Sequence, residues 1–449
     1  MALRPVGNCA ALAGALLLAA GCAAAAVSGA PAPIGPTPLS VTAFTRLVDS
    51  MVLAPAFANA HWGVLIVDPT AGDTLYSRNA GKLFMPASNQ KLLTGATALT
   101  LLGPDYRFRT QFSAAGRITN GALNGDLIVT GSGDPTFSDT MWNGDHRNAF
   151  RAMADSLLAH GVQHITGSLL RGSTPFPDNA CGYGWELDDL DEAYGACVQD
   201  LFVNEGYTRV ARARFPGDTV MTVVAIRDPR GAFFGALRSA FVERGVTMAG
   251  YVDTLRVASG TRLPPIFAMR SPPLSAIVKR MMKPSQNQVA ELLYKTLGRE
   301  KGGAGTADSA RRVVERQLRG WGIDTLGFAV RDGSGMSRHD FIAPNTIIRV
   351  LDVMRRSEHF TLWYDALPIA GVDGTIASRM RGTPAQGNVH AKTGTVDKAR
   401  SLSGYVTTTD GRLLEFSFLC NNFTTPNRAV EQVQDAILVS LAGRPRPTQ

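Results

Sequence analysis

Strand patterns near both ends of the chain place the strongest constraint on its fold. Residues 61–79 contain HWGVLIVDP, TAGD and TLYSRN in succession, which predicts a β-hairpin. Residues 400–420 contain two long strand patterns joined by TTDG, a sequence typical of a hairpin turn. Because a strand needs partners for its backbone groups, we expect both hairpins to pair in one antiparallel sheet of an α+β fold.

The sequence between these hairpins changes character twice. Helical apolar spacing, as in KLLTGATALTLLG, gives way after about residue 104 to strand patterns such as YRFRTQFSAAG, and it returns from about residue 229. A chain of 449 residues is long enough for two or three units. We therefore predict a discontinuous main domain, residues 31–104 and 229–449, interrupted by a β-rich insertion domain, residues 105–228.

Residues 1–30 have the composition of an export leader. Arg4 is followed by an uncharged Ala/Leu-rich run from Cys9 to about Val27, and then by the Pro-rich stretch APAPIGPTP. Cys22 follows Leu-Ala-Ala-Gly, which resembles a lipoprotein processing site. Cleavage by ordinary signal peptidase and retention as a membrane anchor are the alternatives. We expect an exported protein of the periplasm or cell envelope, with membrane anchoring through a lipidated Cys22 as one form.

The cysteines, the charge and the histidines indicate which bonds and partners to expect. Cys181 and Cys197 lie 16 residues apart in an irregular loop, so we expect a disulfide there, with two free thiols as the alternative. Cys420 lies in the apolar run FSFLC and is expected to be a buried thiol. The net charge is +8, but the basic residues form no block, so we predict no nucleic-acid partner. The seven scattered histidines suggest no metal site.

Ser88 and Lys91 form the first motif with chemical meaning. They stand three residues apart at the start of a predicted helix and therefore share one face. A serine hydroxyl needs a nearby base to become a nucleophile, and a desolvated lysine can be that base. The N–H groups of a helix start also favour a developing oxyanion. Taken alone, the pair is more typical of a helix-capping serine with a surface lysine.

Two further polar motifs follow along the chain. Ser285 and Asn287, in KPSQNQVAELL, precede an apolar helical run, where a helix cap is the simpler interpretation. Residues 392–395 (KTGT) lie in a predicted strand. Gly394 would allow a substrate to approach the backbone closely, and Lys392 would offer positive charge to a carboxylate. The alternative is an exposed edge strand protected by a lysine.

Together, the motifs SxxK, SxN and KTG, in this order, resemble those of the penicillin-recognising serine enzymes. Their spacings of 197 and 107 residues resemble those of the class C low-molecular-mass penicillin-binding proteins, the D-alanyl-D-alanine carboxypeptidase/endopeptidase family. The strings GDLIVTGSGDPTFS, RDGSGMSRHDFIAP and LPIAGVDGTIASRMRGTPAQGNVHAKTGTV are also similar to that family. The resemblance implies a penicillin-binding, serine β-lactamase-like fold with a β-rich insertion domain.

The resemblance also implies a mechanism on peptidoglycan stem peptides, with no cofactor, and acylation of the same serine by β-lactams. Ser88 would attack the carbonyl between two terminal D-alanines, Lys91 would take its proton, and Ser285 would relay a proton to the departing amine. The backbone N–H groups of Ser88 and Thr395 would hold the oxyanion, and Thr393 and Lys392 the terminal carboxylate. The implied catalytic residues are Ser88, Lys91, Ser285, Asn287 and Lys392, and the implied substrate-binding residues are Thr393, Gly394 and Thr395.

One segment departs from the family pattern. Better-known members carry an Asp-Thr-Ser-x-Phe string whose Asp meets a side-chain amine of the stem peptide. Here the matching string is LLRGSTPF, with Gly172 at the Asp position and Arg171 beside it. We therefore hypothesise that a carboxylate or amidated group is contacted instead. Trp185 and Tyr194 are expected only to pack the cysteine loop.

Two other functions share these motifs. A serine β-lactamase differs in rapid deacylation, but the long stretch between the first two motifs argues against it. A catalytically idle peptidoglycan-binding scaffold is the second alternative, and the intact set of five catalytic residues argues against that.

Overall fold

The computed structural model describes residues 37–448, apart from residues 216–217 and 257–262. The predicted leader, residues 1–30, and its Cys22 lie outside the described residues. Within the described ranges, no helix is both long enough and apolar enough to span a lipid bilayer.

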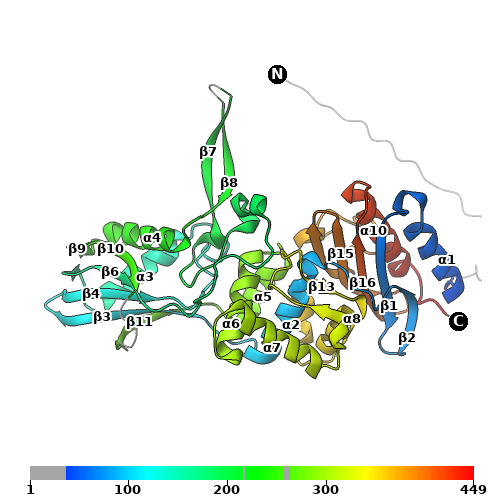
Figure 1. Ribbon diagram of the computed structural model, residues 1–449, viewed down its shortest axis with the longest axis horizontal. Helices are drawn as coiled ribbons and strands as arrows, with labels where there is room; N and C mark the ends of the chain where they lie inside the picture. Colours follow the sequence, from blue (N-terminus) through cyan, green and yellow to red (C-terminus); the bar gives the residue numbers. More distant parts are fainter. Residues whose placement is uncertain (1–36, 216–217, 257–262, 449) are drawn as a thin grey trace, which may run out of the picture. The chain divides into compact units, whose positions relative to one another are not determined.

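An antiparallel five-stranded sheet joins the two ends of the described chain, as predicted. Its order is β14-β15-β16-β1-β2, and β1 pairs with β16 so that Val64 lies opposite Phe418. The N-terminal hairpin thereby adds two strands to the C-terminal meander (Figure 1). The strands are β1 (His61–Asp68), β2 (Asp73–Arg78), β14 (His390–Val396), β15 (Ala399–Thr407) and β16 (Leu413–Asn421).

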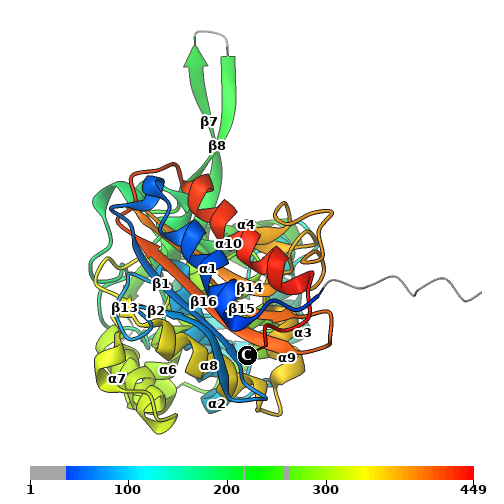
Figure 2. The same ribbon diagram turned by 90° about the vertical axis from the view of Figure 1, so that its right-hand side faces the viewer.

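Helices cover both faces of this sheet, because its strands are apolar on both sides. On one face, α1 (Val41–Val52) and α10 (Asn427–Ala442) lie side by side, as Figure 2 shows. On the other face, α8 (Pro344–Arg355) packs against β16 and β1. Five further helices share a hydrophobic core with α8. They are α2 (Gln90–Leu102), α5 (Leu274–Met282), α6 (Asn287–Gly302), α7 (Ala307–Gly320) and α9 (Phe360–Ala366).

Helix α2 lies at the centre of these helices. Residues 90–99 of α2 are all buried, and the helix contacts α5, α6, α7 and α8. A helix that is surrounded on all sides is held in position by its packing rather than by its own helical propensity. The start of α2 is therefore a rigid place for reactive side chains.

A second, seven-stranded sheet lies between β2 and α5 in the sequence. Its main strand order is β10-β6-β4-β3-β11. The short strand β5 also pairs with β4, and the short strand β9 pairs with β5. The apolar sides of α3 (Arg147–Ala159) and α4 (Pro229–Arg244) form a core with this sheet. The strands are β3 (Arg109–Thr119), β4 (Ala122–Thr130), β5 (His164–Ile165), β6 (Leu169–Arg171), β9 (Thr247–Met248), β10 (Val252–Arg256) and β11 (Pro265–Arg270).

The boundary that we predicted at residue 228 falls inside the elements of this second sheet. Phe233 and Phe241 of α4 pack into its core, and β11 pairs with β3. The helical pattern after residue 229 was real, but the helix belongs to the β-rich part of the chain. We propose that the β-rich insertion extends to about residue 270, where α5 follows.

Two further pairs of strands complete the described elements. The hairpin formed by β7 (Tyr207–Phe215) and β8 (Asp218–Ala225) pairs with neither large sheet, and Figure 1 shows it as a long two-stranded ribbon. The short strands β12 (Phe328–Ala329) and β13 (Phe341–Ile342) pair with each other near α8.

Candidate active site

Ser88 lies in a short 3-10 turn, Ala87–Asn89, that leads directly into the central helix α2. The side-chain amide of Asn89 donates to the carbonyl oxygen of Lys392 at 2.9 Å. This bond connects the turn to β14, the edge strand of the five-stranded sheet. The sheet and the helical region therefore meet at Ser88.

Gly394 allows β14 to pass close to this turn. A Cβ atom at Gly394 would lie 2.0 Å from Ser401 Oγ, 2.5 Å from the Pro86 carbonyl oxygen and 3.0 Å from the Ser88 nitrogen. Two of these neighbours are backbone atoms, so a larger residue would force the strand and the turn apart. Glycine is required here for close approach.

Lys91 lies one helical turn after Ser88 and is fully buried. Its Nζ donates to Ser88 Oγ at 2.8 Å, to Asn287 Oδ1 at 2.6 Å and to the Ser334 carbonyl oxygen at 2.7 Å. Burial lowers the pKa of Lys91 to about 7, although nearby carboxyl groups, led by Asp332, oppose the shift. Near neutral pH, a large fraction of Lys91 is therefore an unprotonated amine in contact with a serine hydroxyl.

Lys392 forms a second serine–lysine pair. Its Nζ donates to Ser285 Oγ at 2.7 Å and to the Thr393 carbonyl oxygen at 2.8 Å. Burial, followed by the charge of Lys91, holds the pKa of Lys392 well below its ordinary value. Ser285 itself has a φ of +65°, in the left-handed region that serine rarely occupies.

Asn287 connects the two pairs to the rest of the fold. It is the first residue of α6, two residues after Ser285. Its Oδ1 accepts from Lys91, and its Nδ2 donates to the Tyr194 carbonyl oxygen at 2.9 Å. The side-chain amide is thus oriented from both ends.

These residues border one cleft of about 650 Å³. Its lining includes the two serines, Asn287 and the exposed side of β14, whereas Lys91 and Lys392 lie beneath the surface. Arg338, Arg379 and Arg400 also line it. All predicted site residues are therefore in or directly under one cleft: Ser88, Lys91, Ser285, Asn287, Lys392, Thr393, Gly394 and Thr395.

Several groups of the site were not found from the sequence. The carbonyl oxygens of Ser334 and Tyr194 are backbone atoms, and no pattern of side chains in the sequence identifies them. Asp332 accepts from the backbone N–H groups of Gly335 and Ser337 at 2.6 and 2.7 Å, which builds the turn that presents Ser334. The string RDGSGMSR was the available signal for that turn.

Glu291 supports the same turn from α6. Its Oε1 accepts from the N–H groups of Gly333 and Ser334 at 3.0 and 2.8 Å. Burial, and next the charge of Asp332, raise the pKa of Glu291 above its ordinary value. A buried carboxyl group therefore lies one peptide unit from the carbonyl that Lys91 contacts.

The cysteine loop contributes more to the cleft than we predicted. Cys181 and Cys197 form a disulfide with a Cα–Cα distance of 4.5 Å. Tyr194 lines the cleft and holds Asn287 through its carbonyl, so it does more than pack the loop. The indole of Trp185 donates to Asp332 Oδ2 at 2.9 Å, which ties the loop to the turn beneath the site.

The segment that departs from the family pattern lies elsewhere. In the described part of the chain, the cleft lining does not include Arg171 or Gly172. Gly172 packs against β4, where an added Cβ would lie 2.0 Å from Thr130 Oγ1. The hypothesis that Arg171 contacts a substrate carboxylate therefore receives no support from its position.

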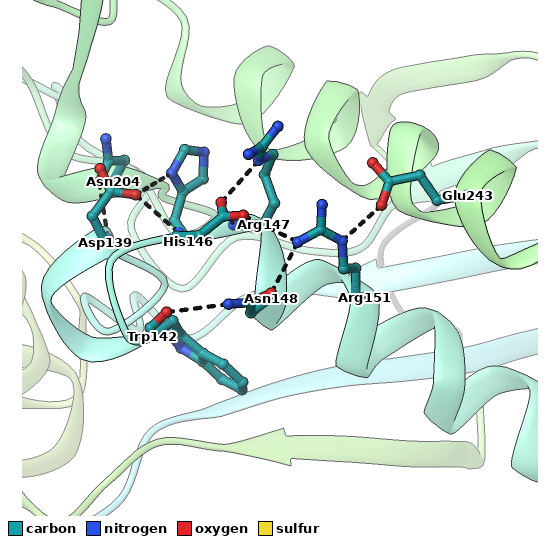
Figure 3. Close-up of polar contacts among 9 residues, drawn as sticks. Asp139, Trp142, His146, Arg147, Asn148, Arg151, Asn204 and Glu243 are labelled. Carbon is teal, nitrogen blue, oxygen red and sulfur yellow. Dashed lines mark hydrogen bonds and ion pairs between the residues drawn. The ribbon is translucent and has the colours of Figure 1, made fainter.

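A cluster that resembles a metal site lies in the loop before α3. Ligand atoms of Asp139, Asp145 and His146 lie within 4.8 Å of one another. However, Asp139 Oδ1 accepts from the backbone and ring nitrogens of His146, as Figure 3 shows. Asp145 pairs with Arg147 and Arg151. These contacts account for the cluster as a network of ion pairs and hydrogen bonds.

Comparisons with known proteins agree with this geometry. The profile of the D-Ala-D-Ala carboxypeptidase 3 (S13) family matches residues 44–225 and 215–443. The chain is 33% identical over 460 aligned positions to a D-alanyl-D-alanine carboxypeptidase of Actinomadura sp. (strain R39), with 88% of this chain and 84% of the relative covered. It is 29% identical to carboxypeptidase DacB of Mycolicibacterium smegmatis, with 93% and 91% covered.

A solved structure has the same fold. Penicillin binding protein 4 of Haemophilus influenzae superposes with a TM-score of 0.78 at 22% identity, with 89% of this chain and 99% of that chain covered. At this identity the likeness concerns the fold alone.

Proposed function

This chain belongs to the D-Ala-D-Ala carboxypeptidase 3 (S13) family and is a D-alanyl-D-alanine peptidase, and we propose that Ser88 is its nucleophile. The observation that carries the proposal is the 2.8 Å hydrogen bond between Ser88 Oγ and the buried amine of Lys91. A second serine–lysine pair, Ser285 and Lys392, lies at the same cleft. A nucleophile with a base in contact and a separate proton relay is what acyl transfer requires.

In the proposed first step, Ser88 Oγ adds to the carbonyl carbon between the two terminal D-alanines of a peptidoglycan stem peptide. The hydroxyl proton passes to unprotonated Lys91. The resulting oxyanion accepts hydrogen bonds from the backbone N–H groups of Ser88 and Thr395, which β14 holds near each other through the close approach at Gly394. Asn287 holds Lys91 in place and offers its amide to the substrate backbone.

Collapse of the intermediate breaks the C–N bond and leaves an ester on Ser88. The proton on Lys91 reaches the departing amine by way of the Ser285 hydroxyl. Water then attacks the ester and gives its proton to Lys91. Lys91 returns the proton to the Ser88 oxygen as the ester bond breaks, which restores the Ser88 hydroxyl and releases the shortened peptide as a carboxylic acid. The same chemistry on a cross-linked stem peptide, with a larger departing amine, is DD-endopeptidase activity. A β-lactam acylates Ser88 in the same way, but its leaving amine stays attached.

The terminal carboxylate of the substrate suits the β14 side of the cleft. Thr393 Oγ1 donates to Thr375 Oγ1 at 2.7 Å, so two hydroxyl groups are already together there. A carboxylate bound beside Lys392 favours the protonated form of that buried amine, because it supplies the opposite charge. Substrate binding would then favour a positive charge on Lys392, against the effect of burial.

Replacement of Ser88 tests the proposal directly. Ser88→Ala should lower covalent labelling by a fluorescent penicillin, and release of D-alanine from a stem peptide, at least ~1,000-fold. Ser239→Ala is a matched control, because Ser239 is exposed on α4 and its hydroxyl donates to the Gly235 carbonyl oxygen of the same helix. Labelling that persists in Ser88→Ala, with label mapped to another residue, would reassign the nucleophile. Label that clears rapidly from the wild type would favour a β-lactamase.

We also propose that the protein is exported to the cell envelope, where its substrate lies, and that Cys22 carries the lipid when the leader is processed as a lipoprotein. The support is the sequence of residues 1–30 alone. Mass spectrometry of the mature protein distinguishes the outcomes. A diacylglyceryl adduct on an N-terminal Cys22 would support lipidation, whereas cleavage after Cys22 would exclude it.

A further inference from the structure

The turn that carries Ser285 and Asn287 is supported by residues 193–206, a segment of the β-rich part of the chain that we call the supporting segment. Its residue Glu205 is buried, with about 1% of its surface exposed. Glu205 bonds residues on both sides of Ser285. We propose that Glu205 is a positioning residue for Ser285 and Asn287 and that it acts through Gln286. The inference rests on the proposed roles of Ser285 and Asn287.

The Glu205 carboxylate connects two elements. Its oxygens accept from Arg280 Nε at 2.6 Å and Arg280 Nη2 at 2.5 Å, in the last turn of α5. One of them also accepts from Gln286 Nε2 at 2.7 Å. Ser285 lies between these two anchors. One carboxylate therefore determines how far the end of α5 lies from the residue that follows Ser285.

This connection matters because of the backbone at Ser285. With a φ of +65°, Ser285 occupies a conformation that a non-glycine residue keeps only when its surroundings enforce it. Two backbone hydrogen bonds, from Ser285 and Gln286 to the last turn of α5 at 3.3 and 2.9 Å, also hold the turn. The bonds to Glu205 are charge-assisted and stronger than these.

Gln286 also holds the start of α6 in place. Its Oε1 accepts from the backbone N–H of Gln288 at 3.2 Å and caps the helix. The side chain of Gln288 is fully buried and donates to the carbonyl oxygens of Ala193, Tyr194 and Ala196. Three consecutive side chains, at positions 286, 287 and 288, thus bond the supporting segment.

Replacing Glu205 with glutamine should break this arrangement without changing its size. The side-chain amide of glutamine would turn an N–H donor toward Arg280 or toward Gln286, both of which are donors. In either orientation the negative charge that strengthens these hydrogen bonds is lost, so the anchor of Gln286 weakens and Ser285 and Asn287 are held less firmly against the two lysines. A misplacement of about 1 Å in such groups lowers reaction rates on the order of 100-fold. We expect acylation to slow by about 10- to 100-fold.

The chain offers a matched control. Glu415 is also buried and pairs with a partly exposed arginine, Arg355, at 3.2 Å. Glu415 lies on β16 and does not line the cleft. The variant Glu415→Gln therefore controls for the replacement of a buried, arginine-paired glutamate away from the cleft. Only Glu205→Gln should slow covalent labelling by a fluorescent penicillin, with the rate constant reduced more than the affinity of the noncovalent complex.

A double-mutant cycle tests the route through Gln286. Gln286→Met removes the bond to Glu205 and the cap on the Gln288 N–H but leaves Arg280 paired, so it keeps the proposal testable if Glu205→Gln does not fold. Gln286→Met alone should slow acylation about 10-fold, and adding it to Glu205→Gln should cost little more. Fully additive losses, wild-type labelling by either single variant, or an equal loss of labelling in Glu415→Gln would overturn the proposal. Labelling that persists in Ser88→Ala would instead overturn the assignment of the nucleophile.

Discussion

The buried position of Lys91 predicts how acylation depends on pH. If unprotonated Lys91 is the base for Ser88, the acylation rate must rise with the fraction of unprotonated amine. Burial lowers the pKa of Lys91 to about 7, so about half of it is unprotonated at pH 7. For a lysine of ordinary pKa the unprotonated fraction at pH 7 is roughly 1 in 3,000. Burial therefore raises the population of the active base by about 1,500-fold, the equivalent of about 4 kcal/mol.

The sign follows from the charge of the group. A lowered lysine pKa means that the amine loses its proton at a lower pH, so acylation should increase from acid toward neutral pH and level off above pH 8. Between pH 7 and pH 5 the unprotonated fraction falls from about one half to about 1 in 100, so the rate should fall about 50-fold.

The assay is the second-order rate constant for labelling by a fluorescent penicillin, measured from pH 5 to pH 9. Circular dichroism at each pH serves as the control that the protein remains folded. A rate that does not change between pH 5 and pH 8, or one that rises only near pH 10, would refute the role of Lys91 as a buried base. Labelling of Ser88→Ala at any pH would refute the assignment of the nucleophile.

Three smaller changes test other parts of the site. Gly394→Ala should slow acylation at least ~100-fold, because the added Cβ would meet backbone atoms beside Ser88; an unchanged labelling rate would mean that β14 shifts without consequence. Replacing Cys181 and Cys197 together with serine should lower the free energy of unfolding by about 3 kcal/mol, measured by urea titration; an unchanged transition midpoint would contradict this value. Arg171→Ala should leave the preference between stem peptides with and without a free side-chain amine unchanged, because Arg171 does not line the cleft. A changed preference, read from product masses, would support contact between Arg171 and the substrate.

The sheet and the reactive side chains were predictable because each leaves a local signal. The hairpin pattern of residues 61–79 and the TTDG turn identified strands that pair as expected in the five-stranded sheet. Lys392 was assigned to a strand, and it lies in β14. Side chains with nucleophilic or basic groups, at spacings that match a known family, could be named one by one.

The boundary of the β-rich part was not predictable in the same way. The pattern of α4 indicates a helix, but no local pattern states against which sheet its apolar face packs. Phe233 and Phe241 contact the core of the seven-stranded sheet, and β11 returns to pair with β3 across more than 140 residues of sequence. Long-range pairing of this kind is decided by packing rather than by propensity.

The supporting contacts of the site were also hidden. The oxygen atoms that hold Lys91 and Asn287 include the backbone carbonyls of Ser334 and Tyr194, which every residue type provides. Glu205 is 81 positions from Gln286 in the sequence, and an isolated glutamate in a loop carries no sign of burial. Only its contacts identify it.

The sequence by itself therefore determined which groups to propose for the chemistry: two hydroxyls, two amines and an amide, in an order typical of one family. The tertiary structure decided the state of those groups. Burial beneath the cleft lowers the pKa of both lysines, and hydrogen bonds from distant segments orient Asn287 and hold Ser285 in an unfavourable conformation. Desolvation and orientation depend on atoms brought together from across the chain, and no short stretch of sequence contains them.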